Sequence, residues 1–489
     1  MSRSGLRLSR RGLLRAALGG GLALAASPLL AACSLRSDLV RPAPGGWDFT
    51  VAGKRFTMYG MNWLDPDTGF WPPHEWSEFS PTRVDQQLGN IASIGVRTIR
   101  VFVAATYFQP TATSVNPEAL KRMDTFLGIA ERHGLSVLFT TPADWEGTPT
   151  YRQPDKFAGT PNLQALAYYW SVVGKTFGRD PRILGWDLHN EGTINWTSSA
   201  MAELWPQWLQ QQYKTVSAVR QAWGTSVSWS GSTFESAPIP PDQSAPGSAF
   251  LWDYQRFREW IADRFLQNQL DALNEAGDHH MRTVGAIQWS VPLYLPSNQP
   301  SAYSGFSPVR VGKNLDFISI HFYPLYSHPP ETSNADTWLT ANILYLQAIL
   351  AYIATGQGDA PRPVVLEEIG EPAGPHAVPF YQAFPKATVP WACGWMPWTY
   401  AIAPTAPTQA WGLFDDTTNT LTPSGQAYKA DRTALREGRQ IQPHAPVLPA
   451  SARPSDEQVL TDPNPEWLWQ FVAAQKLGTI PEGLSSVSG

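Results

Sequence analysis

The chain has 489 residues, of which 43% are hydrophobic and 16% are charged, and its formal net charge at pH 7 is −5. This length and composition favour a large globular core over a disordered chain. The acidic balance excludes the basic surface on which a nucleic-acid-binding protein depends, so we expect no nucleic acid among its partners.

The N-terminus carries export signals. The segment Ser9–Arg15 contains a twin-arginine pattern, the apolar run Ala16–Ala32 follows it, and the run ends at Cys33 in a form that resembles a bacterial lipobox. These features predict a signal peptide over residues 1–33, with an uncleaved membrane helix as the alternative. We expect export by the twin-arginine route and a protein either secreted or held at the cell envelope, with a lipid on Cys33 as its only membrane contact. Residues 34–46 are polar and then rich in Pro and Gly, which predicts a linker.

From residue 47 to residue 430, short β-rich runs alternate with longer helical patterns. The eight strand candidates are Phe56–Asn62, Thr98–Val103, Ser136–Thr140, Leu184–Asn190, Thr283–Trp289, Phe317–Phe322, Pro363–Glu367 and Gly394–Thr399. The helical patterns between them include Val84–Ile94, Pro117–His133, Leu163–Phe177, Phe250–Asn274 and Asn334–Ala354. This alternation predicts an α/β fold, a (β/α)8 TIM barrel. An open doubly wound sheet would need a glycine-rich phosphate turn after an early strand, and the sequence has none.

Two segments exceed what a plain barrel needs. The insertion after the fourth strand, residues 192–282, contains helical patterns at Ala200–Trp223 and Phe250–Asn274. Loops after barrel strands emerge at the active-site face, so we interpret the insertion as one wall of a cleft, with an inert decoration as the alternative. Residues 431–489 predict a C-terminal extension whose one helix candidate, Pro465–Lys476, would dock on the flank of the barrel.

Polar side chains occupy one face of the fourth strand as it ends. In the run 184–191, Asp187, His189 and Glu191 fall on one side, whereas the apolar Leu184, Trp186 and Leu188 fall on the other. A barrel strand that approaches a catalytic rim has this character. Glu191 is therefore the first candidate for a working residue.

Three other strands end in the same way. Arg100 lies between two apolar neighbours, Ser319 and His321 alternate with apolar residues ahead of Tyr323, and an apolar strand ends in Glu367 and Glu368. Because the active site of a barrel lies at the carboxyl ends of its strands, four ends with the same pattern indicate one polar site.

This ordered set resembles glycoside hydrolase family 5, the cellulase and mannanase family of the retaining clan A barrels. The likeness covers about Trp47 to Tyr428. It rests on Arg100, Asn190-Glu191, His321-x-Tyr323, Glu368-Ile369-Gly370, Trp398 and the closing run Gly412–Pro423.

The resemblance implies a role for each residue. Glu191 would be the general acid/base and Glu368 the nucleophile, with carboxyl groups about 5–5.5 Å apart. Arg100 and Tyr323 would hold Glu368 as an anion, and Glu191 would be protonated in the resting enzyme.

The substrate contacts follow from the same resemblance. Asn190 would bind the 2-hydroxyl of the sugar, Trp398 would stack beneath it, and His321 would orient the acid/base or the substrate. We also expect Trp63 and Trp145 among the aromatic side chains that contact the substrate.

Other interpretations of these residues remain open. Either acid alone could be a structural carboxylate paired with Arg100, and His321 could be a core histidine. Glu367 competes with Glu368 as the nucleophile. Neighbouring residues on a strand point opposite ways, however, and the family pattern selects Glu368.

The sequence also departs from the family. The run Thr140–Trp145 lacks the histidine that many members have after the third strand, and Gly192 stands where proline is common. Within the insertion, Trp205–Leu209 and Ala222–Thr225 resemble a segment of family 42 β-galactosidases.

We therefore predict a retaining β-glycosidase that cleaves β-1,4-linked polysaccharide or oligosaccharide. An endo-β-1,4-mannanase or a cellulase-like β-glucanase is preferred. The alternatives are an exo-acting enzyme of the β-galactosidase or β-mannosidase type and a non-catalytic sugar-binding lipoprotein.

The sequence predicts neither a cofactor nor a metal. No cluster has metal-ligand spacing, and His279-His280 falls in a predicted loop. The two cysteines are Cys33 and Cys393, and the apolar surroundings of Cys393 predict a buried, inert thiol. We expect a monomer.

Overall fold

The computed structural model describes residues 38–69, 72–143, 149–225, 227–240, 248–285, 304–324, 335–356, 361–401 and 411–436. The chain divides into two units, Met1–Leu35 and Arg36–Gly489, and every described residue belongs to the second. Cys33, Trp145 and the helix candidate Pro465–Lys476 lie outside the described residues. Among the described helices, none combines the length and the apolar character that a membrane span requires.

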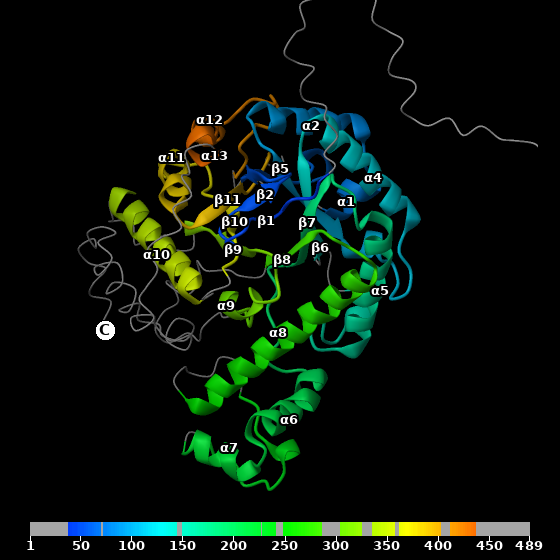
Figure 1. The fold of residues 1–489 in the computed structure, drawn as a ribbon, viewed down its shortest axis with the longest axis vertical. Helices are drawn as coiled ribbons and strands as arrows, with labels where there is room; N and C mark the ends of the chain where they lie inside the picture. Colours follow the sequence, from blue (N-terminus) through cyan, green and yellow to red (C-terminus); the bar gives the residue numbers. More distant parts are fainter. Residues whose placement is uncertain are drawn as a thin grey trace, which may run out of the picture. The chain divides into compact units, whose positions relative to one another are not determined.

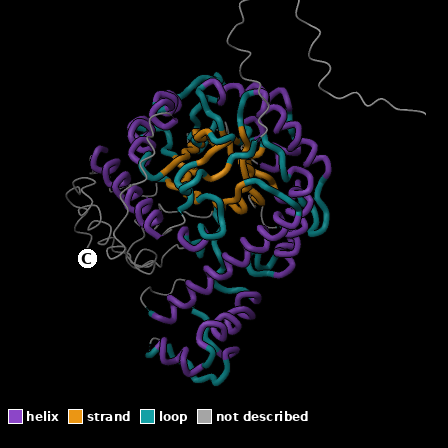
Figure 2. The backbone as a smooth tube through the Cα atoms, in the orientation of Figure 1, coloured by secondary structure: helices purple, strands orange, loops and turns teal. Residues whose placement is uncertain are grey.

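A ring of eight parallel strands forms the centre of the fold (Figures 1 and 2). The strands are β4 Met58–Trp63, β5 Thr98–Ala104, β6 Ser136–Ala143, β7 Ile183–Asn190, β8 Met281–Gly285, β9 Ile318–Phe322, β10 Val364–Ile369 and β11 Ala392–Pro397. Their order is β8-β7-β6-β5-β4-β11-β10-β9. The two end strands approach each other where the amide of Asp316 donates to Arg282 O at 2.9 Å and Thr283 Oγ1 donates to Phe317 O at 2.9 Å. The predicted (β/α)8 barrel is confirmed, with each strand at its expected place and its ends shifted by a few residues.

Helices surround the ring. They are α1 Pro72–Ser77, α2 Pro81–Ser93, α3 Ala105–Phe108, α4 Pro117–Arg132, α5 Thr160–Phe177, α9 Pro308–Val311, α10 Ala335–Gly356, α11 Ala377–Thr388, α12 Pro423–Ala430 and α13 Arg432–Arg436. Local sequence explains where two of them begin. Ser80 and Asn116 each accept a backbone N–H of the first helical turn, and each precedes a proline whose fixed φ suits that position.

A small antiparallel sheet closes the opposite end of the barrel from the site. It consists of β1 Arg41–Pro42, β2 Phe49–Val51 and β3 Lys54–Phe56. Val40, Phe49 and Phe56 join one apolar cluster with residues from the beginnings of the barrel strands. The last part of the predicted linker is thus packed structure. At the other boundary, α13 lies within the predicted extension and buries Leu435.

The insertion after β7 forms a separate helical lobe. It contains α6 Ser199–Tyr213, α7 Val216–Trp223, the 3-10 helix η4 Phe234–Ser236 and α8 Ala249–Glu275. The single helix predicted over Ala200–Trp223 is wrong. Lys214 ends α6 in the left-handed region with φ 62°, and Thr215 then caps α7.

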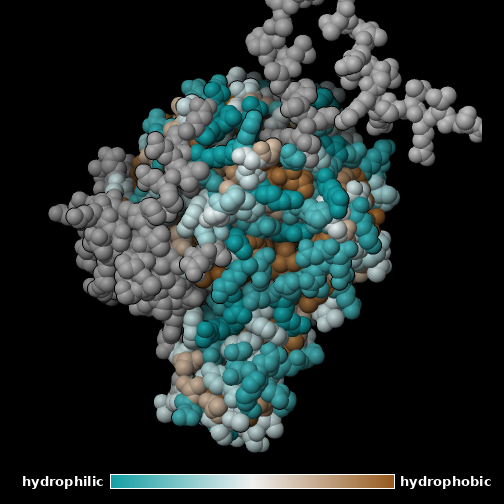
Figure 3. Space-filling model, in the orientation of Figure 1, coloured by the Kyte–Doolittle hydropathy of each residue, from teal (hydrophilic) through white to brown (hydrophobic). Residues whose placement is uncertain are grey.

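The position of this lobe corrects the expectation of a cleft wall. Figure 1 shows α6, α7 and the first half of α8 beside the ring of strands, and not across its opening. Aromatic side chains fill the lobe, where Trp205 stacks on Trp208 and Trp223, and they continue the main hydrophobic cluster of the barrel. The exterior is mostly hydrophilic on the face drawn in Figure 3, and Tyr168 is the one large apolar side chain classed as exposed among the described residues.

Candidate active site

The carboxyl ends of four barrel strands bring together Arg100 from β5, Glu191 after β7, His321 from β9 and Glu368 from β10. One oxygen of Glu191, one ring nitrogen of His321 and one oxygen of Glu368 all lie within 4.8 Å of one another. The two acids, 177 positions apart in sequence, thus face each other across the opening. Their spacing matches the short separation that a retaining mechanism requires.

Two side chains donate hydrogen bonds to Glu368, and the ring of His321 lies close to it. Arg100 Nη1 lies 2.5 Å from Oε1, the Tyr323 hydroxyl donates to Oε2, and His321 Nδ1 lies 3.5 Å from Oε2. Burial, the largest influence, raises the pKa of Glu368, and repulsion by Glu191 adds to the rise. His321, Arg100 and Tyr323 act in the other direction, yet the net direction is upward. The expected contacts of Arg100 and Tyr323 with Glu368 are present, and both oppose the effect of burial on its pKa.

Glu191 is the more accessible acid. Its side chain is 32% exposed, and Oε1 lies 2.9 Å from His321 Nδ1. Its backbone adopts φ 46°, a left-handed conformation that is uncommon for a residue with a Cβ. A bond from its amide to Gly285 O at 2.7 Å holds this conformation. Strain of this kind concentrates at functional sites, where the surrounding structure imposes it.

The alternation expected along β7 is interrupted twice. Pairing with β6 shifts register at Leu184, which faces the barrel interior, unlike Trp186 and Leu188. Pairing with β8 shifts again between Asp187 and Asn190. As a result His189 does not share the face of Asp187. Its ring packs edge-on against Phe157 and Phe265 on the outside of the strand, at centroid distances of 5.2 and 5.6 Å.

The position of His189 explains the glycine that follows the acid. A Cβ on Gly192 would lie 2.4 Å from His189 Cδ2 and 2.9 Å from Phe157 Cζ. Neither proline nor any residue with a side chain fits there without displacing these rings. The departure at Gly192 therefore follows from packing.

Glu367 faces the interior, contrary to the prediction from alternation. The pairing of β10 with β9 passes from Leu366–Ile320 directly to Glu368–His321, so Glu367 is the extra residue of a bulge. Its Oε2 lies 3.2 Å from His321 Nε2, and its Oε1 lies 3.6 Å from Arg100 Nε. Burial alone would raise the pKa of Glu367, but Arg100 and His321 outweigh it and the net direction is downward.

His321 bridges two carboxyl groups. Its side chain is fully buried, with Nδ1 facing Glu191 and Nε2 facing Glu367. Burial acts to lower the pKa of His321, but Glu368, Glu191 and Glu367 together raise it to about 10. The three carboxyl groups thus favour the imidazolium form of the ring at neutral pH. This agrees with the expected contact to the acid/base and not with a neutral core histidine.

Beneath the acids, Arg100 contacts a layer of buried polar groups. Nη2 lies 2.7 Å from both Asp187 Oδ2 and Asn190 Oδ1, and Nη1 lies 3.1 Å from Asn62 Oδ1. Sequence reasoning did not assign roles to Asn62 and Asp187. Asp187 has a signal in the sequence, because it precedes Glu191 on the polar face of β7. Asn62 has none beyond its place at the end of an apolar strand.

Asn62 joins neighbouring strands through its amide. Its Nδ2 donates to Glu367 O at 2.9 Å and Met396 O at 3.0 Å. Burial and repulsion by Glu367 raise the pKa of Asp187 to about 6. The interior layer thus places the carboxyl groups of Asp187 and Glu367 around the same guanidinium, that of Arg100.

The expected aromatic contacts have different outcomes. Trp398 follows β11, is half-buried, and meets Phe102 edge-on at 5.7 Å. Trp63 is not available to a substrate. It is 1% exposed, its indole N–H donates to Gln87 Oε1 at 2.9 Å, and its ring packs on Phe126 behind the barrel wall.

The cluster of two carboxylates and an imidazole also has the composition of a cation site. Arg100 and Tyr323, however, already donate to both oxygens of Glu368. A metal ion there would lie against a guanidinium, so the arrangement fits proton transfer better than cation binding. The predicted thiol is buried as expected, since Cys393 is 0% exposed and its Sγ lies 3.5 Å from Val364 O.

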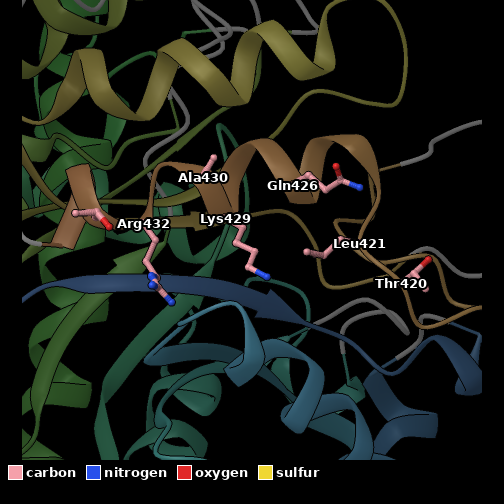
Figure 4. A pocket seen from close by; sticks show the side chains of 7 residues that line it. Thr420, Leu421, Gln426, Lys429, Ala430 and Arg432 are labelled. Carbon is pink, nitrogen blue, oxygen red and sulfur yellow. The ribbon is translucent and has the colours of Figure 1, made fainter.

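A different hollow, of about 720 Å³, is lined by residues of α12, of α13 and of the segment just before α12 (Figure 4). Its lining consists of Thr420, Leu421, Gln426, Lys429, Ala430, Arg432 and Thr433. It contains neither a carboxylate nor an aromatic ring, so it lacks both the acids and the platform that glycoside cleavage requires.

The fold is a (β/α)8 barrel, and its two paired acids lie at the carboxyl ends of the strands. The glycoside hydrolase family 42 β-galactosidase model matches residues 149–357, a region that includes the insertion. Among curated proteins, β-galactosidase YesZ of Bacillus subtilis is 28% identical over 179 residues, covering 34% of this chain and 24% of that protein. The chain therefore matches only about a quarter of the length of this relative.

Solved structures resemble a larger part of the chain. A GH5_18 enzyme of Streptomyces cattleya in complex with Manβ1-4GlcNAc superposes with a TM-score of 0.58 at 18% identity, covering 86% of this chain and 92% of the other. A β-galactosidase of Rahnella sp. R3 gives a TM-score of 0.59 at 15% identity, covering 78% and 56%. At these identities the likeness establishes the fold.

Proposed function

We propose that the protein is a retaining β-glycosidase. The observation that carries this proposal is the pair Glu191 and Glu368, whose carboxyl oxygens come within 4.8 Å across the barrel opening. Two carboxyl groups this close leave no room for a water between acid and base, as an inverting enzyme needs, but suit direct attack by one of them.

In the first step, Glu368 attacks the anomeric carbon and forms a covalent glycosyl ester, while Glu191 donates a proton to the departing oxygen. The relative exposure of the acids suits this division. Glu368 is fixed by Arg100 and Tyr323, whereas Glu191 stands at the accessible edge where a leaving group departs. Asn190 is oriented by Arg100 through its carbonyl oxygen, so its amide nitrogen would donate to the 2-hydroxyl.

In the second step, Glu191 is a carboxylate and takes a proton from water, which attacks the anomeric carbon and releases Glu368. The sugar leaves with the β configuration that it had in the substrate. Trp398, half-buried beside Phe102, would support the ring of the sugar being cleaved.

For the substrate we retain β-1,4-linked mannan or β-glucan oligosaccharides as the first candidate. An exo-acting β-galactosidase or β-mannosidase is the second. It is favoured by the match of the family 42 model across the insertion and by a solved neighbour described as an exo-β-1,4-mannosidase from Opitutaceae bacterium strain TAV5, with a TM-score of 0.51 at 16% identity.

The proposal is tested with aryl β-glycosides and with mannan, glucomannan, carboxymethylcellulose and xylan. We expect Glu368→Ala to lose activity by a factor of at least about 10⁴ and azide to restore turnover as the inverted glycosyl azide. Glu191→Ala should lose about 10²–10⁴-fold on poor leaving groups and much less on dinitrophenyl glycosides, which need no proton. Wild-type activity in Glu368→Ala would exclude the mechanism. Binding without turnover on every glycan would favour a sugar-binding lipoprotein.

A further inference from the structure

Two buried groups, Glu367 and His321, connect the interior of the barrel to the proposed acid/base, Glu191. Glu367 Oε2 lies 3.2 Å from His321 Nε2, and His321 Nδ1 lies 2.9 Å from Glu191 Oε1. The side chains of Glu367 and His321 are 0% exposed, so water does not screen their interaction. The bulge in β10 places Glu367 in this position, and without it the side chain would point out of the barrel.

We propose that Glu367 is a positioning residue that acts on Glu191 through His321, and this inference rests on the proposed function. A ring with a carboxylate against each nitrogen can donate to both only as an imidazolium. Its charge lies against Glu191, where it would favour loss of the proton that an acid catalyst must keep. The carboxylate of Glu367 compensates this charge, so Glu191 faces a neutral ion pair instead of an uncompensated cation.

The other charged groups around Glu367, His321 and Glu191 do not compensate the charge of His321. Arg100 Nη2 is 2.7 Å from Asp187, Nη1 is 2.5 Å from Glu368, and Nε is 3.6 Å from Glu367. The guanidinium of Arg100 is therefore directed mainly at Asp187 and Glu368. Tyr323 donates to Glu368. Among the described residues, Glu367 is the carboxyl group that contacts the inner nitrogen of His321.

The alternative is a purely structural role, in which Glu367 only balances the charge of Arg100. In that case, Glu367→Gln would lower stability or reduce kcat equally at every pH. In our proposal, the variant leaves His321 as an uncompensated cation. Glu191 then loses its proton at lower pH, and the basic limb of kcat/KM should move down by about one pH unit.

Two matched variants control this experiment. Glu367→Asp keeps the charge and should leave the basic limb closer to that of the wild type than Glu367→Gln does. Glu371→Gln makes the same carboxyl-to-amide change three residues after Glu368, at a buried side chain whose pKa is raised to about 7 by burial alone. It should not move the limb. The proposal would be overturned if the basic limb of the kcat/KM profile in Glu367→Gln coincided with that of the wild type. It would also be overturned if Glu371→Gln moved this limb by the same amount.

A second readout does not depend on turnover. In protein labelled with ¹⁵N-histidine, NMR should show both ring nitrogens of wild-type His321 protonated from pH 6 to about pH 9. The midpoint should fall by at least one unit in Glu367→Gln. A singly protonated wild-type ring at pH 7 contradicts the inference even if the variant does not fold. If no glycoside were hydrolysed but the NMR titration came out as expected, the proposed function would be rejected. The ion pair between Glu367 and His321 would still be supported.

Discussion

At the scale of single residues, one guanidinium organises the interior of the site. Arg100 is 0% exposed and reaches Asn62, Asp187, Asn190 and Glu368, which come from three other strands. A planar group with five fixed donors can satisfy such a ring of acceptors, whereas an ammonium group is a single point. The position of the proposed nucleophile therefore depends on the shape of this side chain as well as on its charge.

Replacing Arg100 by lysine should separate these two contributions. Arg100→Lys keeps the charge but loses the planar set of donors, so we expect kcat to fall about 100-fold with a modest loss of stability. Arg100→Met leaves buried acids without compensation and should lower the free energy of unfolding by about 3–5 kcal/mol. Steady-state kinetics and urea unfolding of both variants provide the measurement. Full activity in Arg100→Lys would show that the planar set of donors is dispensable.

Alternation along strands predicted the inward positions of Arg100 and His321 because β5 and β9 have no inserted residue where these residues lie. It failed for His189 and Glu367. A register shift in β7 or β10 is set by pairing with the neighbouring strand, which a single strand's own sequence does not encode. Trp63 was misplaced for another reason. Its aromatic character suits a sugar platform and a packed wall equally well, and only its neighbours distinguish the two.

At the scale of elements, helix α8 of the lobe inserted after β7 contacts the loop that begins at Glu191 through Arg258 and Tyr254. Arg258 of α8 is fully buried, and its Nη2 and Nε donate to Ile194 O at 2.6 and 3.2 Å. Its guanidinium also lies 4.6 Å from the centroid of the Trp196 ring. Both contacts fall on the loop that begins at Glu191. The helix therefore holds the proposed acid/base loop in place, although it stands outside the opening.

Removing this contact should impair catalysis more than binding. We expect Arg258→Met to lower kcat about 10–100-fold with a smaller change in KM, because a loosened loop no longer fixes Glu191. Arg256→Met on the same helix is the control. Its side chain is exposed and lies over Trp252, and its removal should leave kcat unchanged. Equal effects of the two changes would show that the lobe acts only through general stability.

Strands and helices were predictable to within a few residues because apolar periodicity and proline or serine caps are local signals. The break at Lys214 was not, since a left-handed residue other than glycine leaves no mark in the sequence pattern. The lateral position of the lobe was also missed. Loop order predicts that an insertion starts at the opening, but its direction depends on how α8 packs along the barrel.

At the scale of the whole molecule, two buried histidines affect stability in opposite pH ranges. Attraction by acids raises the pKa of His321 to about 10. The stabilising contribution of His321 to the free energy of unfolding is therefore complete below pH 6.5 and is lost as pH rises toward 10. Burial, together with Lys156 and Arg152, lowers the pKa of His189 well below its ordinary value. The contribution of His189 is complete above pH 6.5 and is lost as pH falls below it, because only the unfolded chain then takes up the proton.

His189→Leu should therefore flatten the acid side of the stability profile. The substitution keeps an apolar side chain between Phe157 and Phe265, and it removes a ring whose Nδ1 has no hydrogen-bond partner. Each pH unit below 6.5 should lower the unfolding free energy of the wild type by about 1.4 kcal/mol relative to the variant. Urea titrations at pH 7.5, 6.5 and 5.5 measure this difference, and other titrating groups such as Asp187 cancel in the comparison. Parallel curves for the two proteins would mean that His189 accepts a proton in the folded state, and its packing among aromatic rings would then have to open on acidification.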